Sequence, residues 1–143
     1  MGQEPRKPKG FDEAQLRFEA EVRTSCYAAW DYACGLTRRD LQAEAASDPQ
    51  GYLINLSSTG AYTDPTLLIP ATLDAIYAFE QGHIAIGPRY NFLVDMERIN
   101  PEFLESLNPI GRLHLPSNPA FLPSLTALSA SVIALMSRRS YEE

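Results

Sequence analysis

Apolar side chains near the start of the chain recur at helical spacing. They follow one another at steps of three, four or seven residues: Phe11, Ala14, Phe18, Val22, Ala29, Ala33 and Leu36. Such spacing places side chains on one face of a helix. We therefore expect a long helix over residues 11–36. Its second half is apolar or aromatic nearly all the way round, which predicts burial on more than one side.

The middle of the chain alternates short apolar segments with turn-forming residues. Capping residues, prolines and glycines divide it into expected short helices over 37–46, 70–81, 90–99 and 101–107, with a helical turn at Asp64-Pro65. Asn100-Pro101 is a typical helix start, and Gly82 a typical stop.

Two short segments have the composition of strands. Tyr52–Leu56 is strongly apolar, but turn formers follow it and no partner strand is obvious, so we expect a loop. Ile110–Leu115 is expected to be briefly extended, with Leu113 and Leu115 on one side and Arg112 and His114 on the other.

These elements predict an all-α fold. We expect an irregular bundle of five or six helices over residues 11–143, with the long N-terminal and C-terminal helices packed together, behind a flexible basic tail over residues 1–10. An α+β fold with one or two short strands is the alternative. At 143 residues and 45% hydrophobic composition, one domain with a packed core is the default.

The C-terminal segment carries the most unusual pattern. Asn118-Pro119 is expected to start a helix ending at Arg138-Arg139, and no residue with a permanent charge lies between Arg112 and Arg138. A buried central helix, an interface helix and a membrane anchor all fit this pattern. A membrane span is disfavoured, because residues 120–136 give 17 positions that include Pro123, whereas a span needs about 20 apolar residues.

The interface interpretation names specific residues. A helix with no charge on its outer face is expected to be covered by another surface. The C-terminal residues predicted to bind a partner are Phe121, Leu125, Leu128, Val132, Leu135 and Met136. Tyr27 and Trp30 are also candidates, because aromatic side chains dominate interface hot spots, although core packing competes as their explanation.

The charge distribution limits the class of partner. The net charge of −6 divides into +2 for the first nine residues and −8 for the rest. Nucleic acids require a basic surface, so we expect another protein, or a second copy of this chain, as partner. The tail residues Arg6, Lys7 and Lys9 could contact an acidic partner. The polar N-terminus lacks the apolar stretch of a secretory signal, which predicts an intracellular, cytoplasmic protein, with nuclear import open in a eukaryote.

Signatures of cofactor or metal chemistry are missing from the sequence. No phosphate-binding glycine loop, nucleophile elbow or metal-ligand motif occurs, so we expect neither cofactor nor metal. Cys26 and Cys34 would lie about 12 Å apart along a helix, which predicts reduced thiols. The weak catalytic candidates are His83 or His114, each with Asp95 or Glu97 as the orienting carboxylate.

Together these patterns predict a non-enzymatic interaction protein: a small subunit, an adaptor, or an inhibitor resembling an antitoxin or immunity protein. The alternative is a small cofactor-independent isomerase, dehydratase or hydrolase. That enzyme would use a pocket among Trp30, Tyr77, Tyr90 and one histidine.

Overall fold

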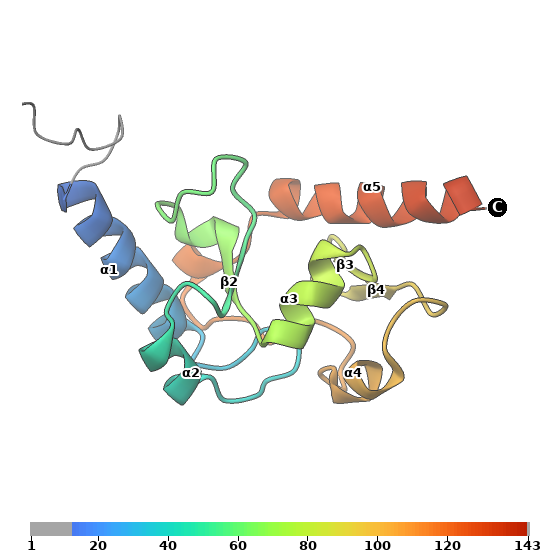
Figure 1. The fold of residues 1–143 in the computed structure, drawn as a ribbon, viewed down its shortest axis with the longest axis horizontal. Helices are drawn as coiled ribbons and strands as arrows, with labels where there is room; N and C mark the ends of the chain where they lie inside the picture. The colour runs from blue at the N-terminus through green and yellow to red at the C-terminus, as the bar shows by residue number, and fades with distance from the viewer. Residues whose placement is uncertain (1–12, 143) are drawn as a thin grey trace, which may run out of the picture.

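The computed structural model describes residues 13–142, in which helices alternate with short strands (Figure 1). The helices are α1 (Glu13–Ala29), α2 (Gln42–Ser47), α3 (Leu73–Glu80), α4 (Pro101–Ser106) and α5 (Leu125–Glu142), with single 3-10 turns η1 (Pro65–Leu67) and η2 (Pro119–Phe121). The strands are β1 (Leu53–Asn55), β2 (Leu68–Pro70), β3 (Ile84–Ile86) and β4 (Phe92–Val94).

The prediction of an all-α fold is wrong. The described residues contain two antiparallel two-stranded sheets, β1–β2 and β3–β4, so the α+β alternative is the fold class observed. Each strand is only three residues long. Segments this short carry too little alternation of polar and apolar residues to be distinguished from one turn of a helix.

The sheet β1–β2 corrects the expectation of a loop at Tyr52–Leu56. Leu53 pairs with Pro70 and Asn55 with Leu68. The sequence places the last residue of the partner strand, Pro70, in a helix over 70–81, because proline is common in the first helical turn. Instead, Thr72 caps α3 by accepting from the Ala75 amide, and α3 begins three residues after that proline.

The sheet β3–β4 replaces the helix expected over 90–99. Ile84 pairs with Val94 and Ile86 with Phe92. Tyr90 turns the chain between the strands with a positive φ of 60°, and its amide donates to the Gly87 carbonyl at 2.9 Å. A left-handed residue of this kind interrupts a helix.

The first long helix ends earlier than expected. Asp31 and Tyr32 have φ values of 56° and 55°, so α1 stops at Ala29 and the segment to Leu36 forms a turn. The two long helices therefore do not form a bundle. α1 packs on β2 and η1, whereas α5 packs on β3 (Figure 1).

The core lies where the loop after α1 meets both sheets. Its largest fully buried side chains include Trp30, Leu36, Leu41, Leu68, Ile69, Ile84, Ile86, Leu113 and Leu128. Several end signals in the sequence are confirmed. Asp64 caps η1, Asn100 caps α4, and Gly82 follows α3 with a φ of 76°.

Candidate functional site

Helix α5 is attached to the body along one face. Its start is fixed by Ser124, whose hydroxyl accepts from the Ala127 amide and whose own amide donates to the Thr66 carbonyl. Leu128 and Leu135 are 1% and 3% exposed on the side that packs on β3. Between them, the Ser131 hydroxyl accepts from the Ile86 amide at 3.2 Å. These contacts define the inner face of α5.

Between Leu125 and Ser137, the opposite side of α5 is exposed and uncharged. At 100° per residue, its exposed positions cover about half of the helix circumference. We call them the outer face of α5: Leu125, Thr126, Ser129, Ala130, Ile133, Ala134, Met136 and Ser137. Leu125, Ile133 and Met136 are 44%, 64% and 61% exposed, so three large apolar side chains lie exposed on this one face. This uncharged outer face is the feature that most resembles a binding surface.

The structure divides the predicted partner-binding residues between the two faces of α5. Leu125 and Met136 lie on the outer face, whereas Leu128 and Leu135 lie on the inner face. Val132 and Phe121 are half-buried. Sequence reasoning missed Ile133, because the outer face can be identified only once the side that packs on β3 is known.

The interpretation of the C-terminal helix as a fully buried central helix is wrong. The segment Pro119–Ser137 has a mean hydropathy of 1.7, but only 17% of it is buried. By length and composition it is the one described segment apolar enough to cross a membrane. However, residues 122–124 separate η2 from α5. The uncharged helical part from Leu125 to Ser137 spans about 20 Å, whereas the hydrocarbon core of a bilayer is about 30 Å thick.

Tyr27 and Trp30 belong to the core and do not form a surface for a partner. Tyr27 is 2% exposed, its hydroxyl donates to the Pro49 carbonyl at 2.6 Å, and burial raises its pKa above the ordinary value. Trp30 is fully buried, and its indole Nε1 has no hydrogen-bond partner within residues 13–142. The tail candidates Arg6, Lys7 and Lys9 lie outside the described residues.

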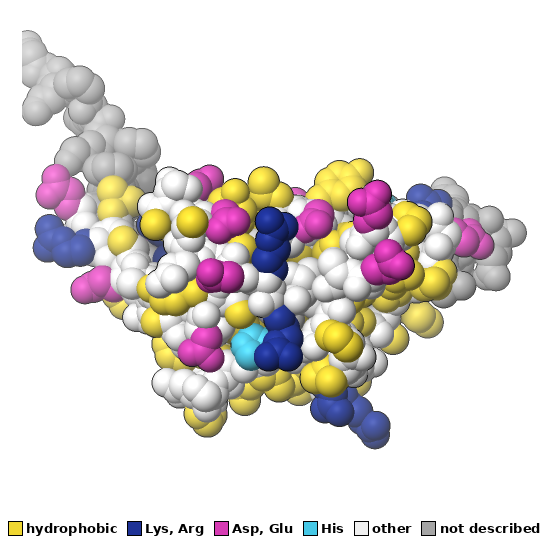
Figure 2. All heavy atoms as spheres, turned by 90° about the horizontal axis from the view of Figure 1, so that it is seen from below, with side chains coloured by type: hydrophobic (Ala, Val, Ile, Leu, Met, Phe, Trp, Pro, Cys, Tyr) yellow, Lys and Arg dark blue, Asp and Glu magenta, His cyan; other side chains and the backbone are white. Residues whose placement is uncertain are grey.

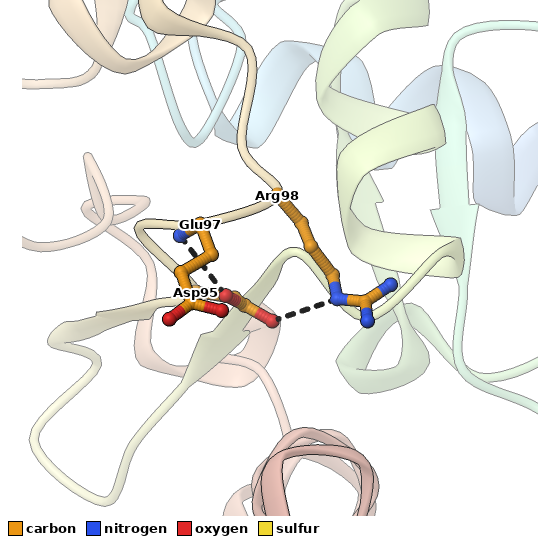
Figure 3. Close-up of polar contacts among 3 residues, drawn as sticks. All are labelled: Asp95, Glu97 and Arg98. Atoms are coloured by element: carbon orange, nitrogen blue, oxygen red, sulfur yellow. Dashed lines mark hydrogen bonds and ion pairs between the residues drawn. The ribbon is translucent and has the colours of Figure 1, made fainter. Parts of the chain in front are cut away.

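The acid–base pair expected from the sequence is not formed. The Asp95 carboxylate, 4% exposed, accepts from the Glu97 amide at 3.1 Å and pairs with Arg98 Nε at 3.4 Å (Figure 3). Its contact with His83 is through the backbone, where the Asp95 amide donates to the His83 carbonyl. The Glu97 side chain is exposed. Neither carboxylate therefore orients an imidazole in this structure.

The two histidines lie in different environments. His83 is half-buried and lines a cavity between α3 and α4. Its ring and the Tyr77 ring meet edge to face, with their centroids 5.8 Å apart. His114 follows the buried Leu113, and its amide donates to the Gly35 carbonyl. Of the aromatic residues predicted to surround an enzyme pocket, only Tyr77 shares this cavity with His83. No described group of three His, Cys, Asp or Glu side chains could hold a metal ion.

Both cysteines are free and buried, as predicted. The Cys26 thiol lies 3.6 Å from the Leu68 carbonyl, and burial raises its pKa from 9.0 to about 12. The Cys34 sulfur lies 3.4 Å from the Thr72 amide nitrogen, which donates to it.

The raised pKa of Cys26 predicts a loss of stability at alkaline pH. Above about pH 9 the thiol ionises in the unfolded chain but stays protonated in the folded one, so unfolding releases a proton. We expect the free energy of unfolding to fall by up to about 1.4 kcal/mol per pH unit between about pH 9 and 10, below most tyrosine ionisation. Urea denaturation across this range measures the slope. Cys26→Ala should flatten this slope; an equal slope in the variant and the wild-type protein would contradict the assignment.

Comparison of the chain with protein-family models, curated proteins and solved structures found no match, so the candidate site is defined by the geometry of this chain alone.

Proposed function

We propose that this chain is a non-enzymatic interaction protein, a subunit of a protein assembly, and that the outer face of α5 is its contact surface. The observation that carries the proposal is that the outer face of α5, between Leu125 and Ser137, is exposed and has no charged residue. Exposed helix faces in soluble domains are normally polar and charged. Here Leu125, Ile133 and Met136 remain exposed beside small residues that permit close approach of another helix.

The occupant that we propose for the outer face of α5 is a second copy of the chain. The chain has a net charge of −6, so two copies repel one another over most of their surfaces. The outer face of α5 adds nothing to this repulsion. In a two-fold symmetric dimer the same surface of each subunit meets its copy, and an uncharged apolar surface is complementary to itself in that arrangement.

A single charge on the outer face tests this proposal. We expect the mass of the wild-type chain in light scattering to increase with protein concentration. Ile133→Arg should weaken dimerisation about tenfold or more, because the dimer would bury the unpaired charge of the new arginine. The matched control is Ile110→Arg, since Ile110 is 69% exposed against 64% for Ile133 but lies outside α5. This control should leave the mass unchanged.

Two results would count against the proposal. A monomer at every concentration would rule out the second copy as occupant. Equal effects of Ile133→Arg and Ile110→Arg would rule out the outer face of α5 as the contact surface. The wild-type chain could instead be monomeric and bind a purified partner protein. If Ile133→Arg abolishes that binding and Ile110→Arg does not, the outer face of α5 is the contact surface and its occupant is another protein.

A further inference from the structure

A cavity of about 640 Å³ lies between α3 and α4, and no residue of the outer face of α5 lines it. Its volume falls in the range of roughly 300–1,000 Å³ that small-molecule sites occupy. Tyr77 and Ala78 line it from α3, His83 from the turn that follows, and Asn100 and Phe103 from the start of α4. Side chains from separate elements therefore meet around one hollow that is large enough for a small ligand.

The charges around this cavity are mainly negative. Asp74, in the first turn of α3, and Glu102, in the first turn of α4, both line it. Arg98 is the one arginine among the described lining residues, and it is already engaged. Its Nε pairs with the Asp95 carboxylate at 3.4 Å (Figure 3), and it has a further interaction within the chain. Figure 2, which views the side of the molecule on which α2 and α4 lie, shows acidic side chains spread across that face. Because Asp95 neutralises Arg98, the charges of Asp74 and Glu102 remain, and they attract a cation and repel an anion.

Both carboxylates keep oxygen atoms that can accept hydrogen bonds from a ligand. Asp74 Oδ1 accepts from the Thr72 hydroxyl and the Ala75 amide, whereas Oδ2 makes no hydrogen bond within residues 13–142. The Glu102 carboxylate makes neither a hydrogen bond nor an ion pair within the same residues. The first amides of α4 are already bonded to Asn100, so this helix end offers no donor to an anion. An ammonium group, which carries three donors and no acceptor, matches this set of free acceptors.

The cavity also presents an aromatic ring and an apolar wall. Tyr77 is 60% exposed, and His83 meets its ring edge to face, so the imidazole covers at most one face of that ring. A cation is attracted to the face of an aromatic ring. Ala78, Ile99 and Phe103, each at most 5% exposed, form the apolar wall. A few polar groups beside such a wall are typical of sites that bind small molecules with an apolar body.

We propose that the cavity between α3 and α4 binds an organic ammonium ion with a compact apolar body. The carboxylates of Asp74 and Glu102 accept from the ammonium group, and the Tyr77 ring and the apolar wall contact the body of the ligand. This site is separate from the outer face of α5, and the proposal does not depend on the contact surface proposed there.

NMR titration of the full chain at neutral pH tests this proposal, with 2-phenylethylammonium as the probe. We expect the probe to shift the His83 ring signals saturably, with a dissociation constant of about 1 mM or below. His114 does not line the cavity and serves as the internal reference.

Three analogues separate the charge of the probe from its ring. 2-Phenylethanol replaces the ammonium group by a hydroxyl, ethylammonium lacks the ring, and 3-phenylpropionate reverses the charge. We expect each of the first two to bind about tenfold more weakly than 2-phenylethylammonium. 3-Phenylpropionate should cause no saturable shift, because the two carboxylates repel it.

Variants identify which groups make the contact. Asp74→Asn and Glu102→Gln each remove a negative charge and keep an oxygen, so each should weaken 2-phenylethylammonium binding about threefold or more. Glu105→Gln is the matched control, because Glu105 is an exposed acidic residue of the same helix as Glu102 but does not line the cavity. It should leave the dissociation constant unchanged. Tyr77→Leu should weaken binding about threefold, whereas Tyr77→Phe, which keeps the ring, should not.

Four results would overturn the proposal. The absence of a saturable shift of the His83 signals would exclude the site. Equal affinity for 2-phenylethanol would exclude a cationic ligand, and equal affinity for ethylammonium would exclude a role for the apolar body. Equal effects of Glu102→Gln and Glu105→Gln would show that the general negative charge of the chain attracts the probe. Ile133→Arg lies outside the cavity and should not change the affinity for 2-phenylethylammonium, so the failure of this proposal and the failure of the contact surface on α5 can be distinguished.

Discussion

Trp30→Ala is expected to lower the free energy of unfolding by about 3–5 kcal/mol, the cost typical of removing a large buried aromatic side chain. Trp30 is fully buried at the point where the loop after α1 meets both sheets. Single domains are stable by only about 5–15 kcal/mol, so this change removes a large fraction of the total. Urea denaturation followed by circular dichroism measures it, because the chain has no other tryptophan to report by fluorescence.

Trp30→Phe separates the packing of the ring from its polar atom. The indole Nε1 is buried without a partner among the described residues, which costs stability in the wild-type protein. Phenylalanine removes that donor, which should stabilise the protein, and part of the ring volume, which should destabilise it, so the two effects oppose one another. We expect a loss of about 1–2 kcal/mol. A loss as large as that of Trp30→Ala would show that Nε1 has a partner in solution.

Gly35→Ala is expected to destabilise the protein by about 1–3 kcal/mol through overpacking. A Cβ atom at Gly35 would lie 2.8 Å from Trp30 Cζ3 and 2.9 Å from Ile69 Cγ2. Both neighbours are fully buried, so neither can move without disturbing the core. The midpoint of urea denaturation should fall, whereas the slope of the free energy of unfolding against urea concentration should not change.

The double variant Gly35→Ala/Trp30→Phe tests the cause of this loss. Phenylalanine lacks Cζ3 of the indole, one of the two atoms that the new Cβ would strike, so the combined loss should be smaller than the sum of the two single losses. Gly51→Ala is the control for adding a Cβ outside the core, because its nearest neighbour is the exposed Asp48 carboxylate, which can move at the cost of the hydrogen bond that it accepts from the Gly51 amide. Additive losses in the double variant would contradict the steric explanation.

The sequence predicted helix ends better than strands, for a physical reason. Caps such as Asn100 and stops such as Gly82 act through their immediate neighbours, so they can be recognised without knowledge of the fold. The pairing of Leu53 with Pro70 joins residues far apart in the chain. Nothing in either segment alone specifies that partner. The turn at Asp31 and Tyr32 was missed because neither residue type is a strong marker of a left-handed conformation.

The candidate sites were predictable to different degrees. The lack of charge along the C-terminal helix is a property of the sequence, and it led directly to α5. Which side of α5 faces outward depends on its packing against β3, so Ile133 could not be selected in advance. The cavity between α3 and α4 brings Tyr77 and Asn100 together from separate elements. The sequence singles out His83 and Tyr77 in that cavity as pocket residues, but it predicts the wrong carboxylate partner for His83 and gives Asn100 only as a helix cap.

The hydrogen bond between α5 and β3 also bears on aggregation. β3 pairs with β4 on one side, and on its other side the Ile86 amide donates to the Ser131 hydroxyl of α5. Exposed strand edges with unpaired amides can recruit strands from other molecules. The inner face of α5 therefore shields an apolar edge strand, Ile84–Ile86, from such strand addition. The same helix would then promote one ordered association through its outer face and prevent a disordered one through its inner face.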